Sequence, residues 1–180
     1  QQNGGLYVFD LSGKIIREKT VLGLRRPNNV DLAHDFSLGG RQVDLAVVTE
    51  RDAGRLRVFT VPAMAAVDGG GLPVFDGDAE RLPMGVALYR RPRDGALFAI
   101  VGARVGPAAG YFWQYRLADA GNGRVRAVKV REFGRFSGKK EIESVAVDAA
   151  AGFVYYSDEG VGVRKYAADP EAPDAGRELA

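Results

Sequence analysis

Charged and amide side chains recur in three stretches of this 180-residue sequence, each time beside a short apolar run. Carboxylates grouped in this way would suit a hard cation such as calcium, which takes about six to eight oxygen ligands in flexible geometry. Arginines in the same place would suit a phosphate group, because a planar guanidinium can donate two parallel hydrogen bonds to it. The residues are Asn28, Asn29, Asp31, Glu50 and Arg51 in the first stretch, Arg104 in the second, where the apolar Met84 takes the other place, and Lys139, Lys140, Glu141, Glu143, Asp158 and Glu159 in the third.

Together these groups predict a site that holds a polyanion through bridging metal ions. A metal ion beside a phosphoryl group neutralises charge on its oxygens and lowers the pKa of a bound water, so hydrolysis there needs no nucleophilic side chain. The sequence offers few other routes to catalysis. It has no cysteine, its single histidine, His34, lacks triad partners, and no Gly-x-Ser-x-Gly elbow occurs.

Short β-type runs of about five to eight residues must position these groups. They are separated by Gly, Asp, Asn and Pro at a spacing of about 8–12 residues, which is typical of an all-β sandwich, barrel or propeller. Helix is expected to be nearly absent. The expected strands are residues 6–11, 14–20, 29–34, 43–51, 55–61, 86–91, 97–103, 111–118, 124–133, 142–148, 153–158 and 163–167.

The expected strands repeat. Val30, Val86 and Val145 occupy corresponding positions at a period of about 50–60 residues, which fits the four-stranded antiparallel blades of a β-propeller. About three blades are visible, and residues 6–20 are expected to contribute outer strands of another. Since propellers have about four to eight blades, residues 1–180 are interpreted as one partial propeller domain of three to four blades.

The repeat predicts that the polar residues converge. The innermost strand of a blade begins at the end of the sheet where its antiparallel neighbour finishes. Residues that enter the first strand of each copy and residues that leave the second strand therefore meet around one mouth of the central channel.

Composition argues against several other partners. The 25 Lys and Arg residues nearly balance the 23 Asp and Glu residues, and both signs are scattered, so neither a nucleic-acid nor a membrane-surface partner is expected. The N-terminus has no signal-peptide pattern, so we expect either a removed leader or a start in mid-domain. Five arginines are expected to be solvated turn charges: Arg25, Arg26, Arg90, Arg91 and Arg93.

The sequence resembles the β-propeller phytases, calcium-dependent phosphatases that hydrolyse phytate (myo-inositol hexakisphosphate). The resemblance covers nearly the whole chain, beginning with the Gly-Leu-Tyr-Val-Phe run from Gly5. Its specific parts are the Asn28-Asn29-Val30-Asp31 element and the pair of carboxylates Glu143 and Glu159. Further similarity lies in residues 43–51, 85–89, 114–117 and 143–159.

The resemblance implies a six-bladed ring whose channel mouth binds several calcium ions and two phosphates of the substrate. Arg51 matches a phosphate-binding arginine and Arg104 falls at a phosphate-binding lysine, while Lys140 could supply a further phosphate contact. Glu143 and Glu159 match calcium-ligating glutamates, with Asp158 as an additional ligand. Asn29 and Val30, the latter through its carbonyl, fall in a structural calcium site.

The sequence also departs from the family. Gln2 and Asn3 stand at lysine positions, Met84 at a tyrosine position and Val105 at an acidic one. These differences indicate a divergent member. The resemblance implies a calcium-dependent phosphomonoesterase, secreted or periplasmic, in which Arg51, Glu143 and Glu159 serve catalysis. Two alternatives remain open, namely a propeller that only binds a ligand or partner, and a propeller lactonase with one divalent ion.

Overall fold

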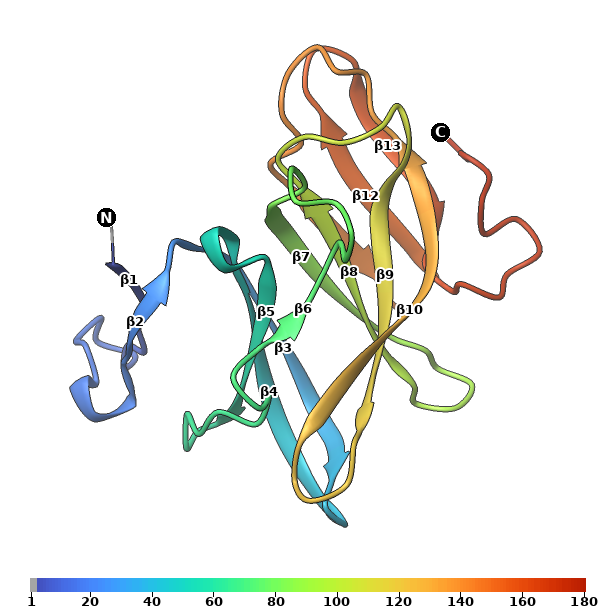
Figure 1. Cartoon of the computed structure of the whole chain (residues 1–180). Coiled ribbons are helices and arrows are strands. Elements are labelled where there is room, and N and C mark those ends of the chain that lie inside the picture. Colours follow the sequence, from blue (N-terminus) through green and yellow to red (C-terminus); the bar gives the residue numbers. More distant parts are fainter. Residues whose placement is uncertain (1–2) are drawn as a thin grey trace.

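The computed structural model describes residues 3–180, and this part of the chain is all β apart from two 3-10 turns (Figure 1). The predicted fold class is therefore confirmed. No helix in residues 3–180 has the length and hydropathy that a membrane crossing would need. The elements are β1 (Asn3–Leu6), η1 (Arg17–Lys19), β2 (Val21–Arg25), β3 (Pro27–Leu38), β4 (Arg41–Glu50), η2 (Arg51–Ala53), β5 (Arg55–Val61), β6 (Leu72–Pro73), β7 (Pro83–Arg90), β8 (Leu97–Ala103), β9 (Ala109–Asp119), β10 (Val125–Arg135), β11 (Val145–Asp148), β12 (Phe153–Asp158) and β13 (Gly162–Ala167).

The strands form antiparallel sheets in sequence order, as propeller blades do. Blade I is β3-β4-β5-β6, blade II is β7-β8-β9-β10 and blade III is β11-β12-β13, while β1 and β2 form a separate pair. The first strands of the three blades are neighbours, because β7 contacts both β3 and β11. This arrangement confirms partial propeller blades; the six-bladed ring stays a prediction.

The internal repeat is confirmed by strand register. Val30 lies opposite Val48 in blade I, and Val86 lies opposite Val101 in blade II. Val145 lies opposite Tyr156 in blade III. The three valines thus hold the same place on the first strand of each blade.

The N-terminal region differs from the prediction. Residues 6–11 and 14–20 are not full strands, because the Asp10 carboxylate accepts hydrogen bonds from the backbone of Ser12 and Lys14 and closes a turn. A single bridge between Phe9 and Ile15 remains of these two expected strands. The real pair joins β1 to β2, and the latter escaped prediction because Gly23 interrupts its apolar pattern.

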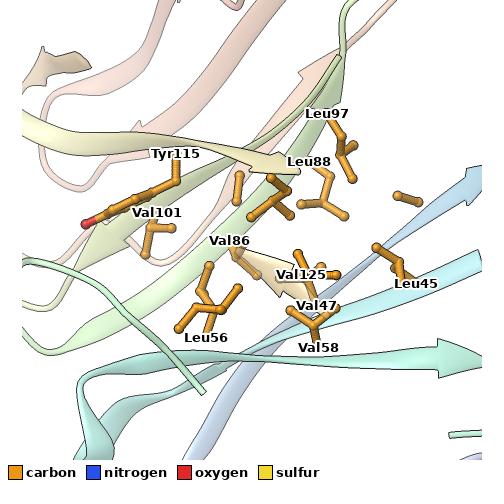
Figure 2. Packing of buried hydrophobic residues seen from close by; sticks show 14 of the residues in the cluster. Leu45, Val47, Leu56, Val58, Val86, Leu88, Leu97, Val101, Tyr115 and Val125 are labelled. Carbon is orange, nitrogen blue, oxygen red and sulfur yellow. The ribbon is translucent and has the colours of Figure 1, made fainter. Parts of the chain in front are cut away.

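The main hydrophobic core lies between blades I and II (Figure 2). Leu45 of β4, Leu56 of β5 and Val101 of β8 are fully buried there. β4 and β8 carry consecutive apolar residues that are covered on both faces. A second core, rich in aromatic residues, joins blades II and III; Phe112 of β9 packs on Tyr156 of β12 with ring centroids 4.7 Å apart. The two cores fix the blades against each other and so fix the ends of their strands.

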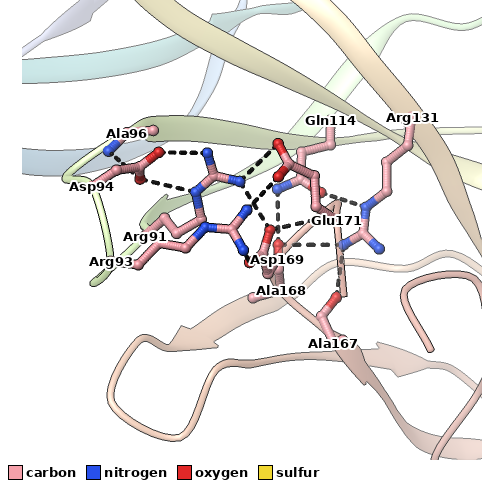
Figure 3. Close-up of polar contacts among 10 residues, drawn as sticks. All are labelled: Arg91, Arg93, Asp94, Ala96, Gln114, Arg131, Ala167, Ala168, Asp169 and Glu171. Atoms are coloured by element: carbon pink, nitrogen blue, oxygen red, sulfur yellow. Dashed lines mark hydrogen bonds and ion pairs between the residues drawn. The ribbon is translucent and has the colours of Figure 1, made fainter. Parts of the chain in front are cut away.

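Arg91 corrects one sequence expectation. Its side chain is only 6% exposed and pairs with Asp94, Asp169 and Glu171 (Figure 3). Arg91 is therefore a buried residue that joins the turn after β7 to the segment after β13, and not a solvated turn charge. Asp94 and Gly95 lie in the turn between β7 and β8, where the Asp94 carboxylate accepts from the Ala96 N–H and Gly95 has a φ of 70°. The chain folds back on the protein after β13, and Arg131 donates to the carbonyls of Ala167, at the end of β13, and of Ala168 and Ala175 beyond it.

Candidate functional site

One backbone hydrogen bond recurs at the same end of all three blades. The residue that follows the second strand donates its N–H to the carbonyl of a residue that precedes the first strand. The three bonds are Arg51 to Arg26 at 3.2 Å, Arg104 to Leu82 at 3.1 Å and Glu159 to Glu141 at 3.4 Å. Arg51, Arg104 and Glu159 are therefore equivalent positions, and we call this edge of the three blades the rim.

Two further contacts tie the blades together at the rim. The Thr49 hydroxyl of blade I donates to the Met84 carbonyl of blade II at 2.8 Å. Arg104, which follows β8 of blade II, donates from Nε to Oε1 of Glu141 at 3.0 Å, just before blade III. The predicted convergence of three distant stretches on one end of the blades agrees with these contacts.

Arg51 is the most buried of the three equivalent rim residues. It is 6% exposed, and its buried Nε has no hydrogen-bond partner within residues 3–180. Burial lowers the pKa of Arg51, and the positive charges of Arg26 and Arg104 lower it further, against the opposing effect of Glu141 and Asp52. A buried N–H donor without an acceptor, near other positive charges, destabilises the folded protein unless an anion accepts its hydrogen bond.

Arg26 is the rim residue that sequence reasoning missed, since it was expected to be a solvated turn charge. It is exposed as expected, but it stands at the entry to β3 with its carbonyl held by Arg51. Its φ of 53° is uncommon for arginine. A usable signal existed in the repeat, because Arg26 directly precedes the first strand of blade I.

Glu143 and Glu159 lie on adjacent segments. Ser157 N–H donates to the Ser144 carbonyl at 3.2 Å, and Glu159 N–H donates to the Glu141 carbonyl. Glu143 therefore lies between Glu141 and Ser144, the two residues whose carbonyls accept hydrogen bonds from the segment 157–159. Glu143 is exposed and Glu159 is half-buried, so both carboxylates can be reached from solvent.

Asp158 is placed differently from its neighbour Glu159. It is fully buried, and its oxygens accept from the backbone and hydroxyl of Ser137 and from Nε of Arg164. Burial by itself would raise the pKa of Asp158, but the bonds from Ser137 and Arg164 outweigh it and hold that pKa below its usual value. These contacts give Asp158 a structural task, and a role in metal binding would require it to exchange them.

Glu50 is the corresponding buried acid of blade I. Its carboxylate accepts from the Arg25 backbone at 2.7 Å and from Nε of Arg55 at 2.5 Å. Burial opposes its ionisation, yet these bonds keep its pKa below the usual value. A buried carboxylate directly before the rim position is thus shared by blades I and III.

The remaining predicted residues lie close to the same end of the blades. The Asn29 backbone N–H donates to the Thr49 hydroxyl oxygen at 3.0 Å. Val30 follows on β3 and is 48% exposed, and Lys140 is exposed in the segment before β11. Asp31 links blades instead, because it accepts from Leu88 N–H at 2.7 Å.

Calcium would need more oxygen ligands than these carboxylates supply. Within residues 3–180 no group of three or more acidic, histidine or cysteine side chains is close enough to hold a metal ion. Glu143 and Glu159 fit part of a calcium shell, which takes about six to eight oxygens, so the others would come from water, substrate or further protein.

Comparison with known proteins decides the family. Over residues 1–180 the sequence matches the family model described as Phytase. The chain belongs to the phytase family. A similar relative is the 3-phytase of Bacillus subtilis (strain 168), with 30% identity over 182 residues, which cover 98% of this chain and 44% of the relative. This phytase-family chain thus spans less than half the length of the curated relative it matches.

The residues at which this sequence differs from the phytase pattern have different surroundings in the structure. Met84 is buried and offers only its carbonyl, to Thr49. Val105 is 46% exposed beside Arg104. Gln2 and the Asn3 side chain lie outside the part that the structure describes, although the Asn3 backbone pairs with Arg25, next to Arg26.

Proposed function

We propose that this chain forms part of a calcium-dependent phosphomonoesterase that hydrolyses phytate or a related phosphate ester. The observation that carries the proposal is the equivalence of Arg51, Arg104 and Glu159 at one rim, in a chain that belongs to the phytase family. Two cationic positions and one acidic position on adjacent blades suit a phosphate that is shared between guanidinium groups and a metal ion.

Each residue has a task that follows from its surroundings. Arg51, buried and with an unpaired Nε, would grip one phosphate and orient it. Arg104 would hold the same or a neighbouring phosphate after releasing Glu141, and Lys140 would add a flexible charge. These contacts would bring the ester to the carboxylates of Glu143 and Glu159 in a fixed orientation.

Glu143 and Glu159 would hold calcium at the rim, and Asn29 and Val30 would serve a separate structural calcium site. Calcium, when bound, would neutralise charge on the phosphate oxygens and supply an activated water. We also propose a secreted or periplasmic location, because such an enzyme needs an environment with free calcium.

The test is release of inorganic phosphate from phytate and from a simple phosphomonoester by the full-length protein, with calcium and with chelator. We expect release only with calcium. Glu159→Gln should lower the rate at least tenfold at limiting calcium, whereas Glu18→Gln, an exposed glutamate of η1, should have no effect. Activity that persists in chelator would refute the calcium mechanism.

A propeller that binds phosphate without hydrolysing it is the second candidate. It is favoured by the small number of grouped carboxylates in residues 3–180 and by the guanidinium groups around Arg51. Phosphate binding without release of phosphate in either condition would support it. Turnover of sugar lactones would instead indicate the lactonase alternative.

A further inference from the structure

Arg26 is an arginine at the rim to which the proposed function assigns no role. Arg26 directly precedes β3, and the Arg51 N–H is fixed on its carbonyl at 3.2 Å. Arg104 holds the position in blade II that Arg51 holds in blade I. The hydrogen bond from Thr49 to Met84 joins these two blades at the same edge. The backbone therefore presents three arginines from two neighbouring blades at one place.

The charges at this place do not cancel. Glu141 pairs with Arg104, and Asp52 is the other acid that acts on Arg51. Arg26 forms no ion pair in residues 3–180, and the Nε of Arg51 is buried without a partner. Arg26 and Arg104 both lower the pKa of Arg51, so each lies near enough to repel its charge. Such an arrangement favours an anion that accepts several hydrogen bonds at once.

The backbone at Arg26 adds an independent observation. Its φ of 53° lies in the left-handed region, where glycine or asparagine is usual and a long side chain is strained. Glycine would relieve that strain, so folding alone does not favour arginine here. An arginine kept at such a position is consistent with a task for its side chain.

We propose that Arg26, together with Arg51 and Arg104, binds a phosphate group directly, without a bridging metal ion. Arg26 is then a substrate-binding residue of the rim. The proposal deepens the proposed function and rests on it for the choice of a phosphate ester as ligand. These three arginines would hold one phosphate before the carboxylates of Glu143 and Glu159 recruit calcium.

Calorimetric titration of the full-length protein with inorganic phosphate, in buffer stripped of metal by a chelating resin, tests the proposal. We expect Arg26→Gln to weaken phosphate binding about tenfold, as the loss of a charge-assisted hydrogen bond should. Arg25→Gln, at the exposed neighbouring position, should change it less than about twofold. Added salt should weaken wild-type binding more than Arg26→Gln binding, because the variant has lost one of the charges that salt screens.

Arg26→Gly separates binding from folding. It should weaken phosphate binding as Arg26→Gln does, yet melt at the same temperature as the wild type or about 2–4 °C higher, because the strain is removed. Unchanged phosphate affinity in both Arg26 variants, an equal loss in Arg25→Gln, or absence of metal-free phosphate binding in the wild type would overturn the inference.

The same measurements keep the two proposals apart. A protein that binds phosphate through Arg26 but releases none from phytate would refute the hydrolase and leave this inference intact. If the protein hydrolyses phytate with calcium and its Arg26 variants bind phosphate normally, the hydrolase proposal stands and the role of Arg26 is refuted.

Discussion

Arg104 of blade II donates from Nε to the carboxylate of Glu141 at 3.0 Å, so a candidate phosphate-binding group is paired with an acid that precedes blade III. Both side chains are substantially exposed, 56% and 40%, and water therefore screens the attraction between them. This pair stabilises the fold little, but a phosphate that approaches Arg104 must compete with Glu141.

Removing that competitor should strengthen phosphate binding. In Glu141→Gln we expect the affinity for inorganic phosphate to rise up to about fivefold, since an exposed pair contributes about 0.2–1 kcal/mol. The comparison is calorimetric titration at low salt against Glu18→Gln, in which an exposed acid on η1 is neutralised. Weaker binding in Glu141→Gln would show that Glu141 orients Arg104 instead of competing for it.

Arg51 should matter for function and not for folding. Arg51→Met keeps a buried side chain of similar length and removes an unpaired Nε, so we expect unfolding free energy within about 1 kcal/mol of the wild type or higher. Activity should fall at least about a hundredfold, as on loss of a transition-state donor. Urea unfolding and phosphate release measure the two effects.

Arg51→Lys is the matched control for this change. It retains the positive charge but loses the planar fork, so its activity should fall between those of the wild type and Arg51→Met. A loss of more than about 2 kcal/mol of stability in Arg51→Met would instead assign Arg51 to the folded core.

Asp158 should govern stability in acid. Its pKa is lowered in the folded protein, so the stabilisation is present above the unfolded value of 3.8 and is lost as the pH falls through the folded value. Asp158→Asn should be destabilised by about 3–5 kcal/mol at pH 7, because Arg164 loses its buried partner. Below about pH 4 the difference from the wild type should shrink.

Urea unfolding at pH 7, 5 and 3 would follow this change, with Glu18→Gln as the exposed control. A difference between wild type and Asp158→Asn that is constant across this range would show that the Asp158 charge is not what stabilises blade III.

The packing between blades I and II should carry much of the stability. Leu56 on β5 is fully buried in the core of Figure 2, and Leu56→Ala should cost about 2–5 kcal/mol. Leu22→Ala on β2 removes the same atoms from a side chain that is 68% exposed and should cost less than about 1 kcal/mol. Equal effects in urea unfolding would place the core elsewhere.

The sequence by itself determined the blades and their order. Strands β5, β8 and β12 have the predicted bounds, because continuous or alternating apolar runs that lie between Gly or Pro residues define strands locally. The recurrence of Val30, Val86 and Val145 was enough to align the blades, since equal spacing along the chain implies equal places in the sheet. That alignment also predicted that Arg51, Arg104 and Glu159 share one rim.

Only the tertiary structure decided which charges are buried, paired or unpaired. Arg91 and Asp158 are charged residues in turn-like or strand-end contexts, and nothing local distinguishes them from solvated residues such as Lys140. Their burial depends on partners 78 residues away for Arg91, and 21 and 6 residues away for Asp158. The significance of Arg26 likewise depends on Arg51, because the field at one charge is set by neighbours in space, which strand patterns do not specify.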